Sequence, residues 1–485
     1  MNDPAKSLPL QPRKRPRAWP WLFLVLLIVT VIRIRLLDTP LERDEGEFAY
    51  GGQLMLHGVS IYAGAYTDAL KLPGTCAAYA LAMALMGQTT TAIHVMVIFV
   101  TLATAILVYL LARRLCSDAA AVIASGAYAL LAISPPSFGL AAHATHFVML
   151  PAVAGIFLLR HSGRQLGSAR IFISGLLLGL AILMKQTGAV FGIFAAVWLA
   201  RCEWVSPVPS PRRLAARLGW LALGGLLPFM VACILIACAG DWPRFWLWTF
   251  QFARAHAEII PLKRGLETAL GVAGQLFMAA PGLWSLSALG LVLLCFGAAG
   301  ATSRFFLAAF FLFSLAAAYP GWRGHYFIQL FPAAGLMAGF AYDALSVRLT
   351  RLKLSWSSSV FLAPIFIVAM ASPLLQWSGI YFTWGPAAVS RAIYGMNPFP
   401  EAVEIGHYLS THCPSNGRIA VLGSEPEIYF YSRRRAATGY IVTYALMERQ
   451  PYAARMQKEM ISQIEKARPD YVVFVHVPVS WLQYS

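Results

Sequence analysis

The chain has 485 residues, of which 59% are hydrophobic and only 12% are charged. Soluble globular proteins have roughly 45–50% apolar and about 25% charged residues, so this composition excludes a single water-soluble domain. It also excludes disordered, coiled-coil and collagen-like chains, which are more polar or more periodic. The fold class predicted is a polytopic α-helical membrane protein.

Apolar runs that are long enough to cross a bilayer recur through most of the chain. We expect eleven transmembrane helices, near residues 19–37, 91–112, 118–133, 146–160, 169–184, 188–202, 214–239, 276–298, 303–319, 325–345 and 357–377. A further apolar run at 72–87 is too short to span. It is expected to be a re-entrant or interface-lying piece on the outer side.

The distribution of charge supports this topology. The net charge of +17 would suit a nucleic-acid partner. However, the predicted cytoplasmic segments hold 18 Lys and Arg against four Asp and Glu, whereas the rest of the chain holds 20 Lys and Arg against 17 Asp and Glu. Positive charge marks cytoplasmic segments of membrane proteins. The N-terminus is therefore expected in the cytoplasm and the C-terminus outside it, and nucleic-acid binding is not expected.

The topology divides the chain into three parts. Residues 1–18 form a basic cytoplasmic tail, 19–377 the transmembrane domain, and 378–485 an extracytoplasmic domain. The last part has short apolar runs, and residues 417–423 and 471–475 read as buried strands. A helix is expected between them at 446–467, stopped by Pro469. Strand, helix and strand predict a small α/β domain.

Four acids lie within six residues of the first outer loop (38–90), directly after the first span: Glu42, Asp44, Glu45 and Glu47. An adjacent carboxylate pair can raise the pKa of one member and create a general base. A structural interpretation competes with this one. Asp44 could cap an interfacial helix over 45–57, with Glu47 closing a box-like pair. The local sequence leaves both interpretations open.

Basic residues recur on the same predicted side of the membrane. They are Arg33, Arg35, Lys71, Lys185, Arg323 and His325. Each one alone would be expected to snorkel to lipid headgroups, whereas together they could surround an anion, for which a phosphate is the obvious candidate. His143 and His146 could bind a metal, although polar packing is favoured without a third ligand.

Cysteine usage gives little support for redox chemistry. The seven cysteines form no C-x-x-C pair. Cys76 and Cys413 are the two placed outside the membrane on the outer side. A disulfide between them is possible, but free buried thiols are the favoured interpretation.

Five short motifs, taken in order and on one side of the membrane, resemble those of the GT-C superfamily of membrane glycosyltransferases. They are Arg43-Asp44-Glu45-Gly46-Glu47, Lys71-Leu72-Pro73-Gly74, Lys185-Gln186-Thr187-Gly188, the segment from His325 to Pro332, and Glu425-Pro426-Glu427-Ile428-Tyr429. The superfamily includes dolichyl-phosphate-mannose protein mannosyltransferases and aminoarabinose transferases of lipid A. The chain most resembles bacterial transferases of galacturonic acid to the lipopolysaccharide core.

The resemblance implies an inverting glycosyltransferase of the bacterial inner membrane. Such an enzyme takes a sugar from a polyprenyl-phosphate donor and gives it to a lipopolysaccharide or lipid A, another glycan, or a protein. Asp44 would be the catalytic base and Glu45 its assistant. Lys71, Lys185, Arg323 and His325 would bind the donor phosphate, although Leu72 interrupts the family's Lys-Pro-Pro pattern. Accessory roles would fall to Arg43, Glu47, His143, His146 and Tyr326.

One departure from the family concerns metal. Relatives often carry an acid in the second outer loop, about where Thr145 stands, whereas this chain has no carboxylate between 119 and 202. A divalent cation, Mg or Mn, is therefore an open expectation, with His143 or His146 as substitutes for the missing acid. A lipid-linked sugar flippase or transporter is the alternative function, since Lys185 lies alone within a long apolar stretch. A non-catalytic membrane-anchored binding protein would leave Asp44 dispensable.

Overall fold

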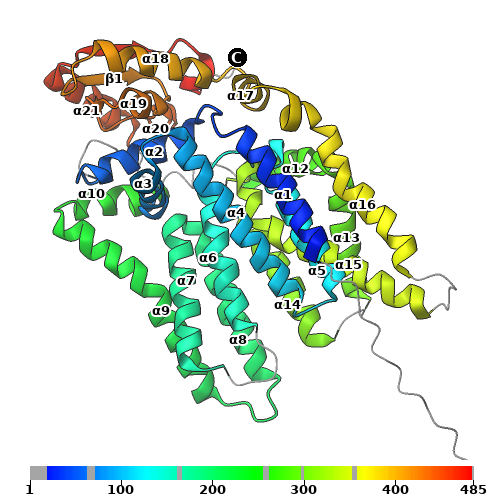
Figure 1. Cartoon of the computed structure of the whole chain (residues 1–485). Helices are drawn as coiled ribbons and strands as arrows, with labels where there is room; N and C mark the ends of the chain where they lie inside the picture. Colours follow the sequence, from blue (N-terminus) through cyan, green and yellow to red (C-terminus); the bar gives the residue numbers. More distant parts are fainter. Residues whose placement is uncertain are drawn as a thin grey trace, which may run out of the picture.

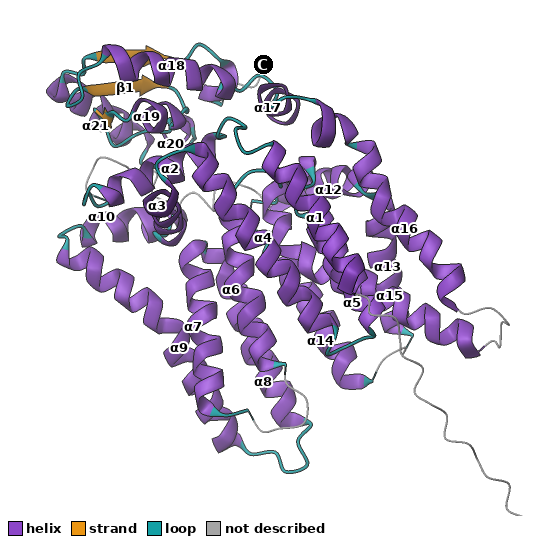
Figure 2. Cartoon of the chain, in the orientation of Figure 1, coloured by secondary structure: helices purple, strands orange, loops and turns teal. Residues whose placement is uncertain are grey.

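The structure is a computed structural model, and it describes residues 19–62, 71–160, 166–254, 262–296, 300–319, 321–351 and 358–482. The basic tail predicted over 1–18 lies outside these ranges. Helices dominate the described part, and a small sheet forms at its C-terminal end (Figure 2).

Helices make up most of the described chain up to residue 376. They are α1 (Trp19–Arg35), α2 (Arg43–Leu56), α3 (Gly74–Met86), α4 (Thr90–Ala112), α5 (Asp118–Leu131), η1 (Pro135–Ser137), α6 (Ala144–Leu159), α7 (Ser168–Met184), η2 (Gln186–Gly188), α8 (Ala189–Trp204), α9 (Pro211–Cys238), α10 (Trp242–Trp246), η3 (Leu247–Phe252), α12 (Leu262–Ala279), α13 (Pro281–Cys295), α14 (Ala301–Ala316), η4 (Gly324–Leu330), α15 (Phe331–Arg351) and α16 (Ser358–Gln376). Each of the eleven predicted spans coincides with one of these helices or with a consecutive pair of them.

Length and hydropathy separate these helices into two groups. Within the described residues, three are long and apolar enough to cross a membrane: Thr90–Ala112, Pro211–Cys238 and Gly324–Thr350. The pair α12 and α13, bent by 112°, makes a fourth if it is one span. Most of the remaining apolar helices have 10–17 residues. The number of eleven crossings therefore stays a prediction.

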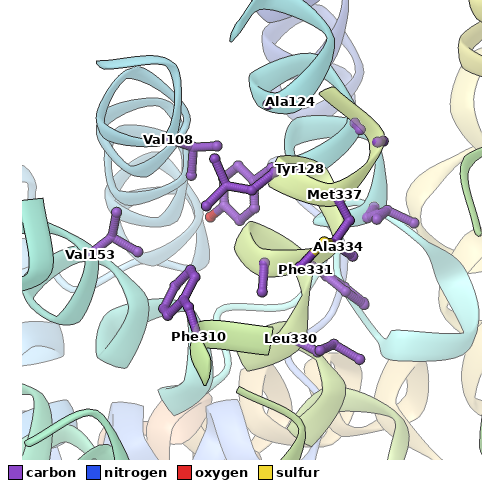
Figure 3. Packing of buried hydrophobic residues seen from close by; sticks show 14 of the residues in the cluster. Val108, Ala124, Tyr128, Val153, Phe310, Leu330, Phe331, Ala334 and Met337 are labelled. Carbon is purple, nitrogen blue, oxygen red and sulfur yellow. The ribbon is translucent and has the colours of Figure 1, made fainter. Parts of the chain in front are cut away.

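A continuous apolar core holds the membrane domain together. In Figure 3, Tyr128 of α5 lies among Val108 of α4, Phe331 of α15 and their neighbours. Small residues bring helix backbones close where α7 meets α9. A Cβ atom on Gly175 would lie 2.2 Å from the carbonyl oxygen of Leu221, so only glycine fits there. Such contacts are typical of membrane helix pairs.

The apolar run predicted as an interface-lying piece is α3. It lies beside α2, between the upper ends of the long helices and the C-terminal part (Figure 1). Tyr79 on α3 donates a hydrogen bond to the carbonyl of Ala142, at 2.7 Å. α3 thus connects α2 to the loop that precedes α6.

The C-terminal part contains η5 (Gly379–Thr383), α17 (Pro386–Tyr394), α18 (Phe399–His412), β1 (Arg418–Leu422), α19 (Glu427–Ser432), β2 (Arg435–Ala436), α20 (Tyr444–Met447), α21 (Ala453–Ala467), β3 (Tyr471–Phe474) and η6 (Pro478–Trp481). Its three strands are parallel, in the order β2-β1-β3. β1 and β3 are the two predicted strands, and Ile419 pairs with Tyr471.

The helix predicted over 446–467 is wrong as a single element. It is two helices, α20 and α21, separated at residues 448–452. Pro451 lies in this gap, where it has no backbone N–H to donate and disfavours helical geometry in the residue before it. The C-terminal part lies over α2 and α3 (Figure 1) and shares an apolar core with them, including Tyr50 of α2 and Tyr429 of α19.

Candidate active site

The site begins at the first turn of α2, which has a capping box. The N-cap is Glu42, whose carboxylate accepts from the N–H of Glu45 at 2.9 Å, while the Glu45 carboxylate accepts from the N–H of Glu42 at 3.2 Å. The interpretation of Asp44 as the cap, with Glu47 closing the box, is therefore wrong. Glu42 already satisfies the first orphan N–H groups of the helix, so the Asp44 carboxylate is not needed there.

The Asp44 carboxylate is instead surrounded by basic side chains. Lys71 Nζ lies 3.2 Å from Oδ1, and His143 Nδ1 and His325 Nε2 lie 3.7 and 3.8 Å from Oδ2. The same Lys71 ammonium binds the carboxylate of Glu47. Burial would raise the pKa of Asp44, but the ammonium group of Lys71, the strongest of the opposing influences, holds that pKa well below its ordinary value. Asp44 is thus ionised at neutral pH, and its side chain is 33% exposed.

Glu45 lies on the opposite side of the helix, away from the cavity described below. Its Oε1 atom accepts from the N–H of Ala142 at 2.6 Å and lies 3.1 Å from His94 Nε2. Burial would raise the pKa of Glu45, but His94 and the Ala142 N–H lower it below its ordinary value. Glu45 is 1% exposed and joins α2, α4 and the loop before α6.

Two imidazole rings form one wall beside Asp44. His143 and His325 stack with their centroids 4.3 Å apart and their planes 10° from parallel. Burial lowers the pKa of His143 to about 4, so this ring is neutral at physiological pH. The second nitrogen of each ring, His143 Nε2 and His325 Nδ1, is buried without a hydrogen-bond partner among the described residues.

Asp44, His143 and His325 also form a possible metal site. One ligand atom from each lies within 4.8 Å of the others. Two imidazole nitrogens and one carboxylate oxygen suit manganese or zinc, whereas magnesium prefers oxygen ligands throughout. Among the described residues the donor set therefore fits manganese better than magnesium.

A cavity of about 590 Å³ opens at Asp44, between the membrane domain and the C-terminal part. Lys71, Lys185 and Arg323 line it, as do Phe138, Tyr394 and Tyr444. Lys185 lies over the ring of Tyr326, with Nζ 3.3 Å from the centroid. Burial lowers the pKa of Lys185 from its ordinary value. The cavity is within the usual size range of small-molecule sites, about 300–1,000 Å³.

The structure separates the predicted site residues into two groups. Most line the cavity: Arg43, Asp44, Glu47, Lys71, His143, Lys185, Arg323, His325 and Tyr326. Glu45 and His146 do not. His146 Nε2 is bonded to the carbonyl of Gly139 at 3.2 Å, and its ring is fully buried.

Arg33 and Arg35, which we expected near an anion, hold main-chain carbonyls instead. Arg33 donates to Gly139 at 2.8 Å and to Ala132 at 3.1 Å, and Arg35 donates to Tyr381 and Trp384. Arg33 thereby fixes the loop that carries His143. All seven cysteines are free, and Cys76 and Cys413 are both buried.

Sequence reasoning missed the contribution of the C-terminal part to this site. Arg43 binds Asn397, Glu425 and the carbonyl of Ser424, and it lies over the ring of Tyr444. α19 approaches α2 so closely that a Cβ atom on Gly46 would lie 2.6 Å from the Cβ of Glu427. The Glu-Pro-Glu motif at 425–427 was the available signal, since charged residues in a buried turn need partners.

Residues 72–236 match the family described as dolichyl-phosphate-mannose-protein mannosyltransferase. Among curated proteins, none matches the sequence significantly.

Solved structures match over most of the chain. ArnT from Cupriavidus metallidurans, bound to undecaprenyl phosphate, is 16% identical, with a TM-score of 0.57 over 86% of this chain and 86% of that one. The chain has the GT-C fold. An oligosaccharyltransferase from Archaeoglobus fulgidus, tethered with an acceptor peptide, is 12% identical, with a TM-score of 0.55 over 95% of this chain and 69% of that one. The same archaeal enzyme in complex with an inhibitory peptide and a dolichol-phosphate gives a TM-score of 0.54, at 13% identity over 94% and 69% of the two chains.

The predicted resemblance to the GT-C superfamily is thus confirmed. The GT-C fold and the family match indicate a multi-pass membrane protein, as the composition predicted.

Proposed function

We propose that this GT-C protein is an inverting glycosyltransferase that takes a sugar from a polyprenyl-phosphate donor, with Asp44 as its general base. The observation that carries the proposal is one ionised carboxylate, Asp44, in a cavity whose adjoining wall presents Lys71, Lys185 and Arg323. Solved proteins of the same fold bind undecaprenyl phosphate and dolichol-phosphate, which supports a lipid-phosphate donor.

The donor phosphate would lie against Lys71 and Lys185. A polyprenyl phosphate is already a good leaving group, so the protein has to stabilise the departing oxyanion and position one hydroxyl. The two ammonium groups provide that stabilisation. Lys71 contacts Asp44 directly, at 3.2 Å, so the phosphate and the base would share one cation at the reacting centre.

A carboxylate of low pKa is an adequate base in this reaction. The acceptor oxygen attacks the anomeric carbon while the bond from that carbon to the phosphate oxygen breaks. As the new carbon–oxygen bond forms, the acceptor hydroxyl becomes much more acidic, and its proton passes to Asp44 late in the step. The polyprenyl phosphate leaves with the bonding electron pair, and attack from the opposite face inverts the anomeric carbon.

We also propose a site for a divalent cation, although no step of the reaction described above depends on it. Asp44, His143 and His325 would hold it, and it would supply additional positive charge beside the donor phosphate. Glu45, which is buried behind the helix, is given a positioning role through its bonds to Ala142 and His94. We propose the bacterial inner membrane as the location, with the cavity on the extracytoplasmic side.

The test is transfer of radiolabel from a panel of polyprenyl-phosphate-linked sugars to an outer-membrane glycolipid extract, followed by thin-layer and mass analysis. We expect transfer by the wild-type protein and a loss of about 10³-fold in Asp44→Asn. Glu401→Gln, a change at an exposed acid, is the control. Full activity in Asp44→Asn would show that Asp44 is not the general base. Retention of the anomeric configuration would reject the inverting mechanism. Parallel reactions with EDTA, and with manganese or zinc added back, test the metal.

A further inference from the structure

Aromatic side chains continue the wall of the cavity beyond His143 and His325. The Phe138 ring lies 6.2 Å from His143 and 5.3 Å from Tyr394, and the Tyr394 ring lies 5.3 Å from Phe399. Phe399 is 1% exposed and backs Tyr394. Phe138 and Tyr394 are half-buried, and each lines the cavity. A row of aromatic rings therefore starts beside Asp44.

Arg43 links the row of rings to Tyr444, a third aromatic residue that lines the cavity. Arg43 lies over the ring of Phe399 at 5.6 Å and over the ring of Tyr444 at 4.7 Å, and Tyr444 also lines the cavity. The Tyr444 hydroxyl donates to the carbonyl of Val479 at 2.9 Å, which fixes the ring. Three segments distant in the sequence thus contribute rings to the same wall.

The backbone of Phe138 gives an independent reason to connect this wall with function. Phe138 has a φ of 52° and a ψ of 32°, the left-handed region that a residue with a Cβ atom avoids. Arg33 holds the segment in place through the carbonyls of Gly139 and Leu140. Strained residues of this kind concentrate at ligand sites, where the surrounding structure enforces them. Here the strained backbone presents a ring to the cavity.

Charge distinguishes the two ends of the cavity. Lys71, Lys185 and Arg323 line the end proposed for the donor phosphate. At the aromatic end the charged lining residues are Glu42, Arg43 and Glu448, and Arg43 is paired with Glu425. An acceptor phosphate would meet the acidic side chains of Glu42 and Glu448 there, in addition to the Asp44 carboxylate. A neutral, hydroxylated ring fits this end, because the C–H face of a pyranose is apolar and stacks on aromatic faces.

We propose that Phe138, Tyr394 and Tyr444 form the acceptor subsite and that the acceptor is a carbohydrate. One pyranose ring stacks on Phe138 and Tyr394 and directs a hydroxyl at Asp44. That oxygen forms the new bond to the anomeric carbon, its proton goes to Asp44, and the polyprenyl phosphate leaves. This inference rests on the proposed function and narrows its acceptors to glycans.

Binding of sugar can be measured without knowing the natural acceptor. The full chain in lipid nanodiscs is saturated with undecaprenyl phosphate, which fills the donor end. It is then mixed with a panel of methyl pyranosides, and saturation-transfer NMR records which sugars receive magnetisation from the protein. We expect transfer to ring protons in the wild type and a loss of affinity of about tenfold or more in Tyr394→Ala. Phe382→Ala, an exposed aromatic that does not line the cavity, is the matched control.

Phe138→Gly separates binding from folding. Glycine adopts a positive φ freely, so relief of the strain offsets part of the packing that is lost with the ring, and the thermal midpoint of this variant is expected to lie above that of Phe138→Ala. Its affinity for pyranosides is nevertheless expected to fall like that of Tyr394→Ala. Saturation transfer to none of the pyranosides, or equal transfer in all variants, would overturn the inference.

A second arm distinguishes this inference from the proposed function. In transfer reactions, the protein and each polyprenyl-phosphate sugar donor are mixed with one of three acceptors: a dephosphorylated oligosaccharide pool, a phosphorylated glycolipid or a Ser/Thr peptide. Product on the oligosaccharide that is lost in Phe138→Gly supports the inference. Product on phosphate or peptide, undiminished in Phe138→Gly, overturns it and leaves the transferase intact. Pyranoside binding without turnover of any donor would support a carbohydrate site and reject the transferase.

Discussion

The two pairs of acids at the start of α2 use the same chemistry for different purposes. Glu42 and Glu45 bind each other's main-chain N–H groups, whereas Asp44 and Glu47 share the ammonium of Lys71. In a helix each residue turns by about 100°, so pairs displaced by two residues point about 200° apart. One pair therefore caps the helix, although Glu42 also reaches the edge of the cavity, and the other pair shares Lys71 within the cavity.

The different partners of Glu45 and Asp44 show how one carboxylate can hold the structure while its neighbour stays accessible to a ligand. Glu45 is fixed by main-chain and histidine partners that no substrate can replace. Asp44 is contacted by the side chains of Lys71, His143 and His325, and 33% of its own side chain is exposed. A substrate phosphate can compete for Lys71 without disturbing α2. Changes in the Glu45 pair should therefore lower stability, and changes around Asp44 should alter activity and its pH dependence.

The largest effect on stability is expected from Glu45→Ala. The change leaves His94 and the Ala142 N–H buried without their carboxylate. Each buried group that loses its hydrogen-bond partner costs about 1–3 kcal/mol. Chemical unfolding in detergent would measure this loss against Glu401→Ala, whose exposed pair with Arg391 contributes at most about 1 kcal/mol. Equal stability of the two variants would refute the scaffold role of Glu45.

A smaller effect, on catalysis, is expected from Lys71→Met. We expect donor KM to rise about 10- to 100-fold with little change in acceptor KM, because a charge-assisted contact to phosphate contributes about 1.5–3 kcal/mol. Lys466→Met, at an exposed lysine, is the control. An unchanged donor KM would take Lys71 out of the phosphate site.

The same variant should shift the pH profile. Lys71 is the first of the positive neighbours that lower the pKa of Asp44 against the effect of burial. Removing its charge raises that pKa toward, or beyond, the ordinary value. Activity depends on the ionised carboxylate and is lost as pH falls through its pKa, so the acid limb of kcat/KM should move to higher pH. An acid limb that stays in place would show that ionisation of Asp44 does not determine the pH dependence of kcat/KM.

Local patterns predicted much of this fold and part of the site. An apolar run is a local property, so each of the eleven predicted spans could be placed on a helix, or on a consecutive pair of helices, from the sequence. Asp44 and Lys71 could be identified because charges beside apolar runs are conspicuous. The cap at Glu42 could not, since four neighbouring acids are each able to cap a helix. His143 and His146 are equally ambiguous, and only the fold shows that His143 reaches Asp44.

Long-range contacts account for what could not be predicted. The rings of Phe138, Tyr394 and Tyr444 come from three distant segments, and aromatic residues make up 13% of the chain, so no local pattern distinguishes these three. Arg33 was expected near an anion because a basic residue at a helix end has many possible partners. Its carbonyl partners lie about a hundred residues away. Packing of remote segments therefore determines the shape of the cavity.

The smallest effect is expected where the C-terminal part meets α2. Glu427 is fully buried against Gly46, and both of its carboxylate oxygens are without hydrogen-bond partners among the described residues. Burial, together with the charge of Glu425, raises the pKa of Glu427 well above its ordinary value. A raised pKa means that the folded state binds the proton more tightly than the unfolded state. The contribution of Glu427 to stability is therefore full below the ordinary glutamate pKa and is lost as pH rises through the folded-state pKa.

Glu427→Gln replaces the carboxyl with a neutral group and should remove this pH dependence. We expect the variant and the wild type to have similar thermal midpoints near pH 4 and the variant to gain about 1–2 kcal/mol toward pH 8. Glu404→Gln, at an exposed position on α18, is the control. A variant that is less stable than the wild type at pH 7 would mean that Glu427 is ionised and paired. In that case the ionised form of Glu427 would pack against α2, and Glu427 would stabilise the structure through its charge, as Glu45 does.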